Sequence, residues 1–143
     1  MRNKIKILIM GLPGSGKTTL AKQLSQFFEA DWFNADEIRT KYKDYDFSHN
    51  GIIRQVNRMK DLANKSKNNF VVADFVCPLK EQLKIFKPNI IIWMDTIKKG
   101  RYSDMNGMFK APEKFDLRIT TKDIKNNFTN SLEKIIKYIG RSN

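Results

Sequence analysis

The sequence predicts a three-layer α/β/α fold built around a five-stranded parallel sheet. Five short apolar runs have the composition of strands, and segments with helical periodicity separate them along the chain. Strands that alternate with helices pair in parallel, and the helices then cover both faces of the sheet. The expected strands are residues 4–10, 31–34, 69–75, 89–95 and 117–120.

The strands differ in how strongly their composition predicts them. Residues 4–10 are rich in β-branched side chains and end at a glycine, Gly11. Residues 69–75 and 89–95 are nearly continuous apolar runs, which is typical of parallel strands that are covered on both faces. Residues 31–34 and 117–120 are shorter and more weakly patterned.

The expected helices cover residues 17–28, 50–65, 78–87 and 122–139, and apolar side chains recur there every three or four positions. Residues 98–113 show neither period, so we expect a mobile loop over the functional site. The apolar stripes consist of Leu20, Leu24, Phe27 and Phe28 in the first helix, Ile52, Val56, Met59 and Ala63 in the second, and Ile124, Phe128, Leu132, Ile135, Ile136 and Ile139 in the last.

Length and composition indicate a single domain over residues 1–143. Hydrophobic residues make up 41% of the chain and charged residues 29%, as in folded globular proteins. The sequence has no apolar run long enough to span a bilayer and no secretory cleavage signal after Met1. Its single cysteine, Cys77, cannot form an intrachain disulfide and is expected to be a small buried residue. We therefore expect a cytoplasmic protein without a membrane partner.

The net charge of +12, from 27 Lys and Arg against 15 Asp and Glu, has two interpretations. It would attract polyanions such as nucleotides, nucleic acids or anionic membranes. It would equally describe a well-solvated surface, because the lysines are spread along the whole chain.

Residues 11–18 carry the strongest functional signal. They read GLPGSGKT and match the phosphate-loop pattern G-x-x-x-x-G-K-[ST] between an expected strand and an expected helix. Glycines let successive backbone N–H groups face an anion, and the start of the following helix adds positive potential. Lys17 would bridge the β- and γ-phosphates of ATP or GTP, and the hydroxyl of Thr18 would bind Mg²⁺. The expected nucleotide-binding residues are Gly11, Leu12, Pro13, Gly14, Ser15, Gly16, Lys17, Thr18 and Thr19, and the fold is that of a P-loop NTPase.

A candidate acceptor side follows the second expected strand. Asp36 would lie beyond the carboxyl end of the sheet, where open α/β sheets bind their ligands. There it could accept the proton of an attacking hydroxyl or orient Mg²⁺. Arg39 could hold an anionic acceptor. The alternative is that Asp36 caps a helix and that Arg39 is solvated.

The segments GLPGSGKTTLA and FNADEIR resemble the adenylylsulfate (APS) kinases, which phosphorylate the ribose 3′-hydroxyl of adenosine 5′-phosphosulfate. Further patches occur in the same order: Phe47 and Ser48, then Arg54 to Asn57, resemble an F-S…R-x-x-N run, and residues 74–78 resemble S-F-I-S-P. Residues 95–96 resemble the end of that family's fourth strand, and residues 106–110 resemble a shortened form of its K-G-L-Y-K lid.

The resemblance implies roles for individual residues. Asp36 would be the catalytic base or metal organiser, and Arg39, Arg54 and Asn57 would hold the phosphosulfate and ribose. Phe75 would stack on the acceptor base, although an aromatic residue at the end of a buried strand can equally belong to the core. Phe47, Val76 and Lys110 complete the implied acceptor site, and Arg101 is the favoured lid cation near the transferring phosphate. The resemblance also implies Mg·ATP as phosphate donor, a small anionic acceptor such as a nucleotide, and a homodimer.

The sequence departs from that family in three places, one of which is the shortened lid, so other functions stay open. Asn34 replaces the first acid of an Asp-Gly-Asp motif, and the family's F-T-G segment is absent. A polynucleotide 5′-hydroxyl kinase would also have a phosphate loop, an N-x-D-D-x-R run and a later strand-terminal aspartate such as Asp74. A nucleotide-binding protein without transferase activity is the third alternative, whereas the absence of an N-K-x-D motif argues against a GTPase.

Overall fold

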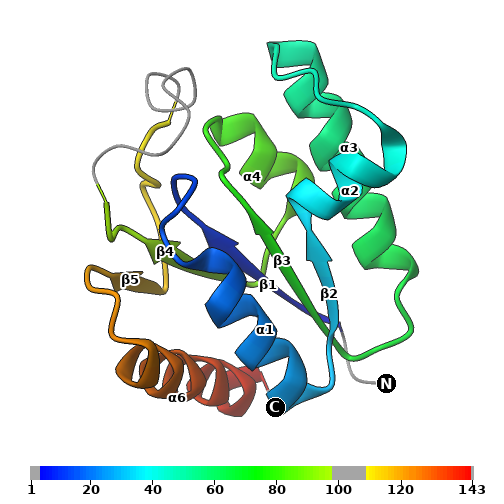
Figure 1. Cartoon of the computed structure of the whole chain (residues 1–143). Coiled ribbons are helices and arrows are strands. Elements are labelled where there is room, and N and C mark those ends of the chain that lie inside the picture. Colours follow the sequence, from blue (N-terminus) through cyan, green and yellow to red (C-terminus); the bar gives the residue numbers. More distant parts are fainter. Residues whose placement is uncertain (1–3, 98–108, 143) are drawn as a thin grey trace.

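The computed structural model describes residues 4–97 and 109–142 and has the predicted α/β/α arrangement (Figure 1). One parallel sheet has the strand order β2-β3-β1-β4-β5. Each of the five expected strands is present, within one residue of its expected ends. The strands are β1 (Ile5–Met10), β2 (Asp31–Asn34), β3 (Phe70–Phe75), β4 (Ile90–Met94) and β5 (Leu117–Ile119).

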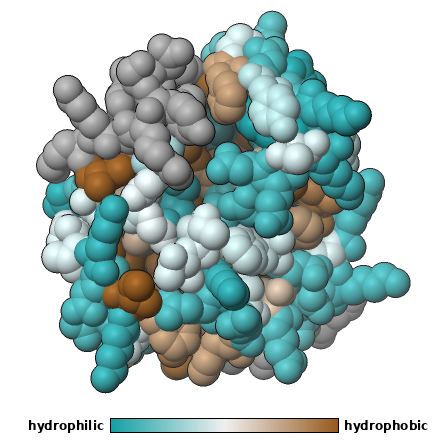
Figure 2. Space-filling view, viewed as in Figure 1, coloured by the Kyte–Doolittle hydropathy of each residue, from teal (hydrophilic) through white to brown (hydrophobic). Residues whose placement is uncertain are grey.

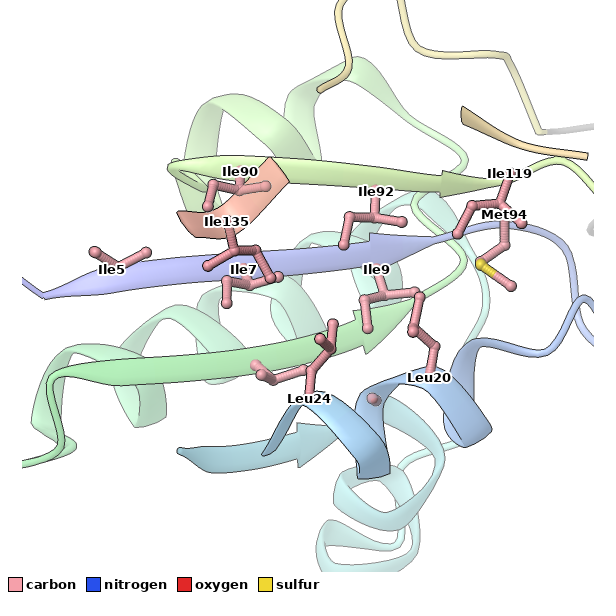
Figure 3. Packing of buried hydrophobic residues seen from close by; sticks show 12 residues of the cluster. Ile5, Ile7, Ile9, Leu20, Leu24, Ile90, Ile92, Met94, Ile119 and Ile135 are labelled. Carbon is pink, nitrogen blue, oxygen red and sulfur yellow. The ribbon is translucent and has the colours of Figure 1, made fainter. Parts of the chain in front are cut away.

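The helices lie on both faces of this sheet (Figure 1). They are α1 (Lys17–Phe28), α2 (Ala35–Tyr42), α3 (His49–Lys65), α4 (Lys80–Phe86) and α6 (Ile124–Ser142). The central strand β1 explains this layering, because its side chains alternate between the faces. Ile7 and Ile9 pack against α1 and α6 (Figure 3). Leu8 and Met10 pack against α2, α3 and α4 on the other face. All four of these side chains are almost completely buried.

Helices α1 and α3 confirm the periodicity argument most closely. Helix α1 has the predicted bounds, and α3 begins one residue before its predicted start. The predicted stripe of α3 is entirely buried: Ile52, Val56, Met59 and Ala63. Helix α4 is shorter than predicted, because the backbone N–H of Leu79 donates to the side chain of Gln82 (2.9 Å) and the helix starts only at Lys80.

Three apolar residues that we expected on buried stripes are instead exposed. Phe27 of α1 is 55% exposed, and Ile124 and Ile136 of α6 are 56% and 54% exposed. The buried faces of α1 and α6 are therefore narrower than their apolar stripes. Figure 2 shows the consequence: small apolar patches interrupt a largely hydrophilic surface on the side of these helices.

Helix α2 was not expected from periodicity. Its N-cap is Asn34, whose side-chain oxygen accepts a hydrogen bond from the N–H of Glu37 (2.9 Å). Only Ile38 and Arg39 of this helix are buried, so its sequence lacks a repeated apolar stripe. The helix is thus stabilised by its N-cap and by the packing of Ile38 and Arg39, which lie in a single turn.

The loop that we expected at residues 98–113 falls mainly on residues 98–108, which lie outside the described residues. Among the described residues, no helix has the length and hydropathy needed to cross a membrane.

Candidate functional site

The phosphate loop joins β1 to α1 in a conformation that requires glycine. The backbone angle φ is +88° at Gly14 and +101° at Gly16, in the left-handed region that side chains disfavour. A Cβ atom on Gly11 would lie 2.5 Å from the carbonyl oxygen of Met94 and 2.8 Å from Ser15 Oγ. The glycines of the motif therefore allow both the curl of the loop and its close approach to β4.

Lys17 lies at the centre of this loop. It is 9% exposed, and its Nζ donates hydrogen bonds to the carbonyl oxygens of Gly11 (2.9 Å) and Leu12 (3.0 Å). These two hydrogen bonds hold the buried ammonium group beside the loop, where it could form an ion pair with an anion bound there.

Two side chains from distant segments hold the same loop from outside. Thr96, just after β4, donates through its hydroxyl to the carbonyl of Ser15 (2.7 Å). Lys122, between β5 and α6, donates through Nζ to the carbonyl of Gly14 (3.0 Å). Neither contact is predictable from the sequence, because nothing in the spacing of these residues relates them to the loop. By fixing the two carbonyls, they also orient the peptide units whose N–H groups an anion would contact.

The loop fits the triphosphate of a nucleotide. The first N–H groups of a helix have no acceptor within the helix, and Gly16, at the N-cap of α1, has no side chain to cap it. The hydroxyl of Ser15 is buried and has no hydrogen-bond partner in the part of the chain that the structure describes. Thr18 and Thr19 are exposed in the first turn of α1, where their hydroxyls can reach a ligand.

Asp74 is a site residue for which the sequence predicted a role in only one of the alternative functions. It lies near the end of β3, next to β1 in the sheet, and is almost completely buried. Its two carboxylate oxygens accept hydrogen bonds from Trp32 Nε1 (2.6 Å) and Asn34 Nδ2 (2.8 Å). An acid near the end of an otherwise apolar strand was the signal that could have identified it.

The environment of Asp74 makes its carboxyl group unusually weak as an acid. Burial raises the pKa of Asp74 to about 6, and the negative charge of Asp36 acts in the same direction. The hydrogen bond from Trp32, the positive charge of Lys17 and the hydrogen bond from Asn34 all act to lower this pKa. The carboxyl group therefore responds to both the lysine of the phosphate loop and the acid of the expected acceptor side.

These residues also fit a magnesium ion bound together with nucleotide phosphates. Mg²⁺ in such sites usually has one or two carboxylates, with phosphate oxygens and water completing its shell. Thr18 could supply its hydroxyl, and Asp36 or Asp74 a carboxylate oxygen. The described residues contain no group of three or more acidic, histidine or cysteine side chains that could hold a metal by themselves.

Five of the residues expected on the acceptor side line one small cavity of about 50 Å³. Helix α2 supplies Asp36 and Arg39, the following loop supplies Phe47, and the end of β3 and its following turn supply Phe75 and Val76. The remaining wall is mostly apolar and comes from Ala35, Ile52, Gln55, Val56, Met59, Cys77, Pro78 and Gln82. Asp36 is exposed at this cavity, and it does not provide the cap of α2.

Arg39 is not solvated but belongs to the cavity wall. It is 6% exposed, and its guanidinium group lies 4.2 Å from the ring centre of Phe47. It donates to the carbonyl oxygens of Asp44 (3.0 Å) and Asp46 (3.2 Å). Burial lowers the pKa of Arg39, and the charge of Asp44 opposes this shift. Arg39 thereby holds the loop that carries Phe47.

Arg54 and Asn57 do not line this cavity. Arg54 donates to both carboxylate oxygens of Asp44 (2.7 and 3.0 Å) and to Asp46 (3.2 Å). Arg58 also donates to Asp44 (2.8 Å), and these bonds hold the pKa of Asp44 well below its usual range. The side-chain amide of Asn57 donates to the carbonyl of Ile53 (3.0 Å). The positive charge of Arg54 thus faces two carboxylates of its own chain.

Phe75 contacts both the hydrophobic core and the acceptor-side cavity, the two alternatives that the sequence left open. It is 5% exposed and packs edge-to-face against Phe86 of α4, with ring centres 5.5 Å apart, and it also lines the cavity. Cys77 is buried, as expected, in the same turn. Lys110 is exposed and lines a different cavity, and Arg101 lies outside the described residues.

Comparison with known protein families gives one match that covers more than half of the chain. The model of the family described as chromatin associated protein KTI12 matches residues 6–102. The chain belongs to the KTI12 family.

The matched range of the KTI12 family runs from β1 to just beyond β4. It therefore includes the phosphate loop, Asp36, Asp74 and every residue that lines the small cavity. None of the curated proteins matches the chain.

Several solved structures have the same fold as this KTI12 family member. The APS kinase CysC of Mycobacterium tuberculosis, in complex with AMPPNP and APS, is 16% identical with a TM-score of 0.78, and the match covers 94% of this chain and 99% of that chain. APE1195 is 21% identical with a TM-score of 0.75, covering 96% of each chain. Shikimate kinase from Aquifex aeolicus vf5 is 15% identical with a TM-score of 0.69, covering 92% of this chain and 96% of that chain.

The expected likeness to APS kinases therefore holds for the fold. The fold is that of P-loop kinases that act on small molecules, and family membership is with KTI12 rather than with a particular kinase.

Proposed function

We propose that this chain is an ATP-dependent phosphotransferase that moves the γ-phosphate of ATP to a hydroxyl group of a small acceptor. One observation carries this proposal: the cavity that Asp36 lines lies at the same edge of the sheet as the phosphate loop. The combined effect of Lys17 and Asp36 on the pKa of Asp74 supports this proximity.

In this proposal, catalysis depends on position and charge. The N–H groups around Ser15 and the ammonium group of Lys17 bind the phosphates, and Asp36 accepts the proton of the acceptor hydroxyl. Mg²⁺, held by Thr18 and a carboxylate, would neutralise phosphate charge. Asp74 keeps Asn34 and Trp32 in place and thereby positions the start of α2, which carries Asp36.

For the acceptor, we propose a small molecule with a flat or apolar part that enters between Phe47 and Phe75, for which the cavity of about 50 Å³ would have to widen. The APS kinase resemblance makes the 3′-hydroxyl of adenosine 5′-phosphosulfate the first candidate. The contacts of Arg54 with Asp44 and Asp46 leave Arg39 as the remaining candidate to bind its anionic groups, because Lys110 lines a different cavity.

A second candidate is phosphorylation of a polynucleotide 5′-hydroxyl group, and Asp74 favours it. The strand-terminal aspartate matches the pattern of such kinases, whereas the APS kinases have serine there. The description of the KTI12 family as chromatin associated also favours contact with nucleic acid, as does the net charge of +12. A 5′-hydroxyl kinase should bind oligonucleotides with an affinity that falls steeply as salt rises.

The deciding experiment measures ADP release from Mg·ATP with a panel of acceptors, using Lys17→Ala as the blank. The panel contains adenosine 5′-phosphosulfate, a 5′-hydroxyl oligonucleotide, gluconate and shikimate. We expect acceptor-dependent ADP release, which Lys17→Ala abolishes, with one of the first two compounds. Binding of Mg·ATP without release for any acceptor would contradict phosphotransfer and would favour a nucleotide-binding role without turnover.

A further inference from the structure

A second and larger cavity, of about 350 Å³, lies beside α4, and none of its described lining residues belongs to the phosphate loop. One wall is α4 itself, the floor includes Met10 at the end of β1 and Ile91 of β4, and residues 110–114 close the opposite side. This volume is in the range of small-molecule sites. Neither the KTI12 family description nor the phosphotransfer proposal uses this cavity.

The rim of the cavity is strongly positive. Glu113 is the one acid among the described residues that line it, and its carboxylate is paired with a lysine of α4. The pKa of the neighbouring Lys6 is lowered by burial first, then by the charge of Lys4 and then by the charge of Lys87. The positive field of Lys87 therefore extends beyond the cavity. Five lysines line the cavity: Lys80, Lys84, Lys87, Lys110 and Lys114. Like charges gathered around one cavity repel each other, and an anion bound between them would offset this repulsion.

Below this rim, the lining is apolar and aliphatic. Leu79, Leu83, Pro88, Ile91 and Pro112 all contribute, and each is only half-buried. None of the described lining residues is aromatic. A cavity without aromatic side chains lacks the stacking surfaces on which single-stranded nucleic acids and nucleotide bases usually bind. The aliphatic lining complements a hydrocarbon chain, and the lysines of the rim complement an anionic group at the end of that chain.

We propose that this lysine-rimmed cavity binds a small aliphatic anion, namely a hydrocarbon chain with a terminal phosphate, sulfonate or carboxylate group. The chain covers the half-buried side chains of the floor, and the anionic group lies among the lysines of the rim. None of the described lining residues belongs to the phosphate loop, so this binding does not require phosphotransfer.

Isothermal titration calorimetry with n-octyl phosphate tests the proposal. We expect saturable binding with one site per chain and the same affinity with and without excess Mg·ADP. Inorganic phosphate and 1-octanol, which represent the two parts of the probe, should each bind at least tenfold more weakly. Equal affinity for either part alone, or competition by Mg·ADP, would overturn the proposal.

Charge reversal at the C-terminal end of α4 and at its C-cap locates the binding. Lys84→Glu combined with Lys87→Glu should weaken the binding of octyl phosphate by about tenfold, because two attractive charges become repulsive. Lys134→Glu combined with Lys137→Glu, on the exposed face of α6, is the matched control and should leave the affinity unchanged. Equal loss in both double variants would show a general charge effect and overturn the assignment. Displacement of octyl phosphate by a single-stranded oligonucleotide would replace it with a nucleic-acid site.

Discussion

The indole Nε1 of Trp32 donates a hydrogen bond of 2.6 Å to a carboxylate oxygen of Asp74, across 42 positions of the sequence. The two residues lie on the neighbouring strands β2 and β3. The same carboxylate also accepts a hydrogen bond from Asn34 at the start of α2. The positive charge of Lys17 in the phosphate loop lowers the pKa of this carboxylate, so Asp74 links the loop to the start of α2.

The raised pKa of Asp74 predicts a specific dependence of stability on pH. The folded pKa is about 6 and the ordinary value is 3.8, so the folded state holds the proton more tightly than the unfolded state. The free energy of unfolding should therefore fall as pH rises from 4 to 7, by about 2 kcal/mol from this group alone. In urea unfolding, Asp74→Asn should lack this part of the dependence, so that its stability relative to the wild type rises with pH. A constant difference across this range would contradict the assignment.

Removal of the indole donor should shift the same titration. Trp32→Phe deletes a hydrogen bond that favours the charged carboxylate, so the pKa of Asp74 should rise further above 6. The carboxyl carbon shift of Asp74, followed by NMR against pH and assigned with Asp74→Asn, measures this pKa. Trp93→Phe is the matched control on β4, and the two variants should differ clearly in this titration.

Gly51, in the first turn of α3, should tolerate no side chain. A Cβ atom there would lie 2.0 Å from the carbonyl oxygen of Asp46, in the loop that carries Phe47. We expect Gly51→Ala to lower the free energy of unfolding by about 2–4 kcal/mol, because backbone must move. At Gly140 of α6, an added Cβ would meet nothing within 4 Å. Gly140→Ala should therefore be neutral or slightly stabilising, and similar losses at both positions would show that the close approach of Asp46 is unimportant.

Asp36→Asn should separate nucleotide binding from turnover. The amide keeps the size of the side chain but cannot accept a proton as a base, so turnover should fall by about 10²–10⁴-fold. The affinity for Mg·ATP, measured by calorimetry, should change little. Asp61→Asn, at an exposed position of α3, is the control and should retain full activity. Unchanged turnover in Asp36→Asn would remove this residue from the acceptor side.

Lys122 should contribute to nucleotide affinity through the loop that it holds. Lys122→Met removes the hydrogen bond to the carbonyl of Gly14, and we expect binding of Mg·ATP to weaken by about three- to tenfold. Lys125→Met, three residues later in α6, changes the net charge equally and should have almost no effect. Equal weakening would indicate long-range charge rather than loop geometry.

The parts of the fold that the sequence predicts are those where local pattern and tertiary role coincide. The strand, phosphate loop and first helix form one continuous signal, because Gly11, Gly14 and Gly16 are needed by the local backbone itself. The buried stripe of α3 is similarly visible, since Ile52, Val56, Met59 and Ala63 repeat with helical spacing.

The parts that sequence reasoning missed depend on contacts made across a turn, which the periodicity of a single helix does not reveal. Arg39 is buried because its guanidinium group has carbonyl acceptors at Asp44 and Asp46, and its own neighbours in α2 do not reveal this. The charge of Arg54 was expected at an anionic acceptor, but the turn after α2 brings Asp44 to it. The charge of an arginine does not show whether its guanidinium group binds a ligand or stabilises a loop of its own chain.

The thiol of Cys77 belongs to the linings of both cavities described above. Burial raises its pKa to about 12, and it is the only cysteine in the sequence. At neutral pH it should react with alkylating reagents only when the turn after β3 opens. The rate of its alkylation thus measures how often the wall between the two cavities opens, and the measurement needs no introduced label.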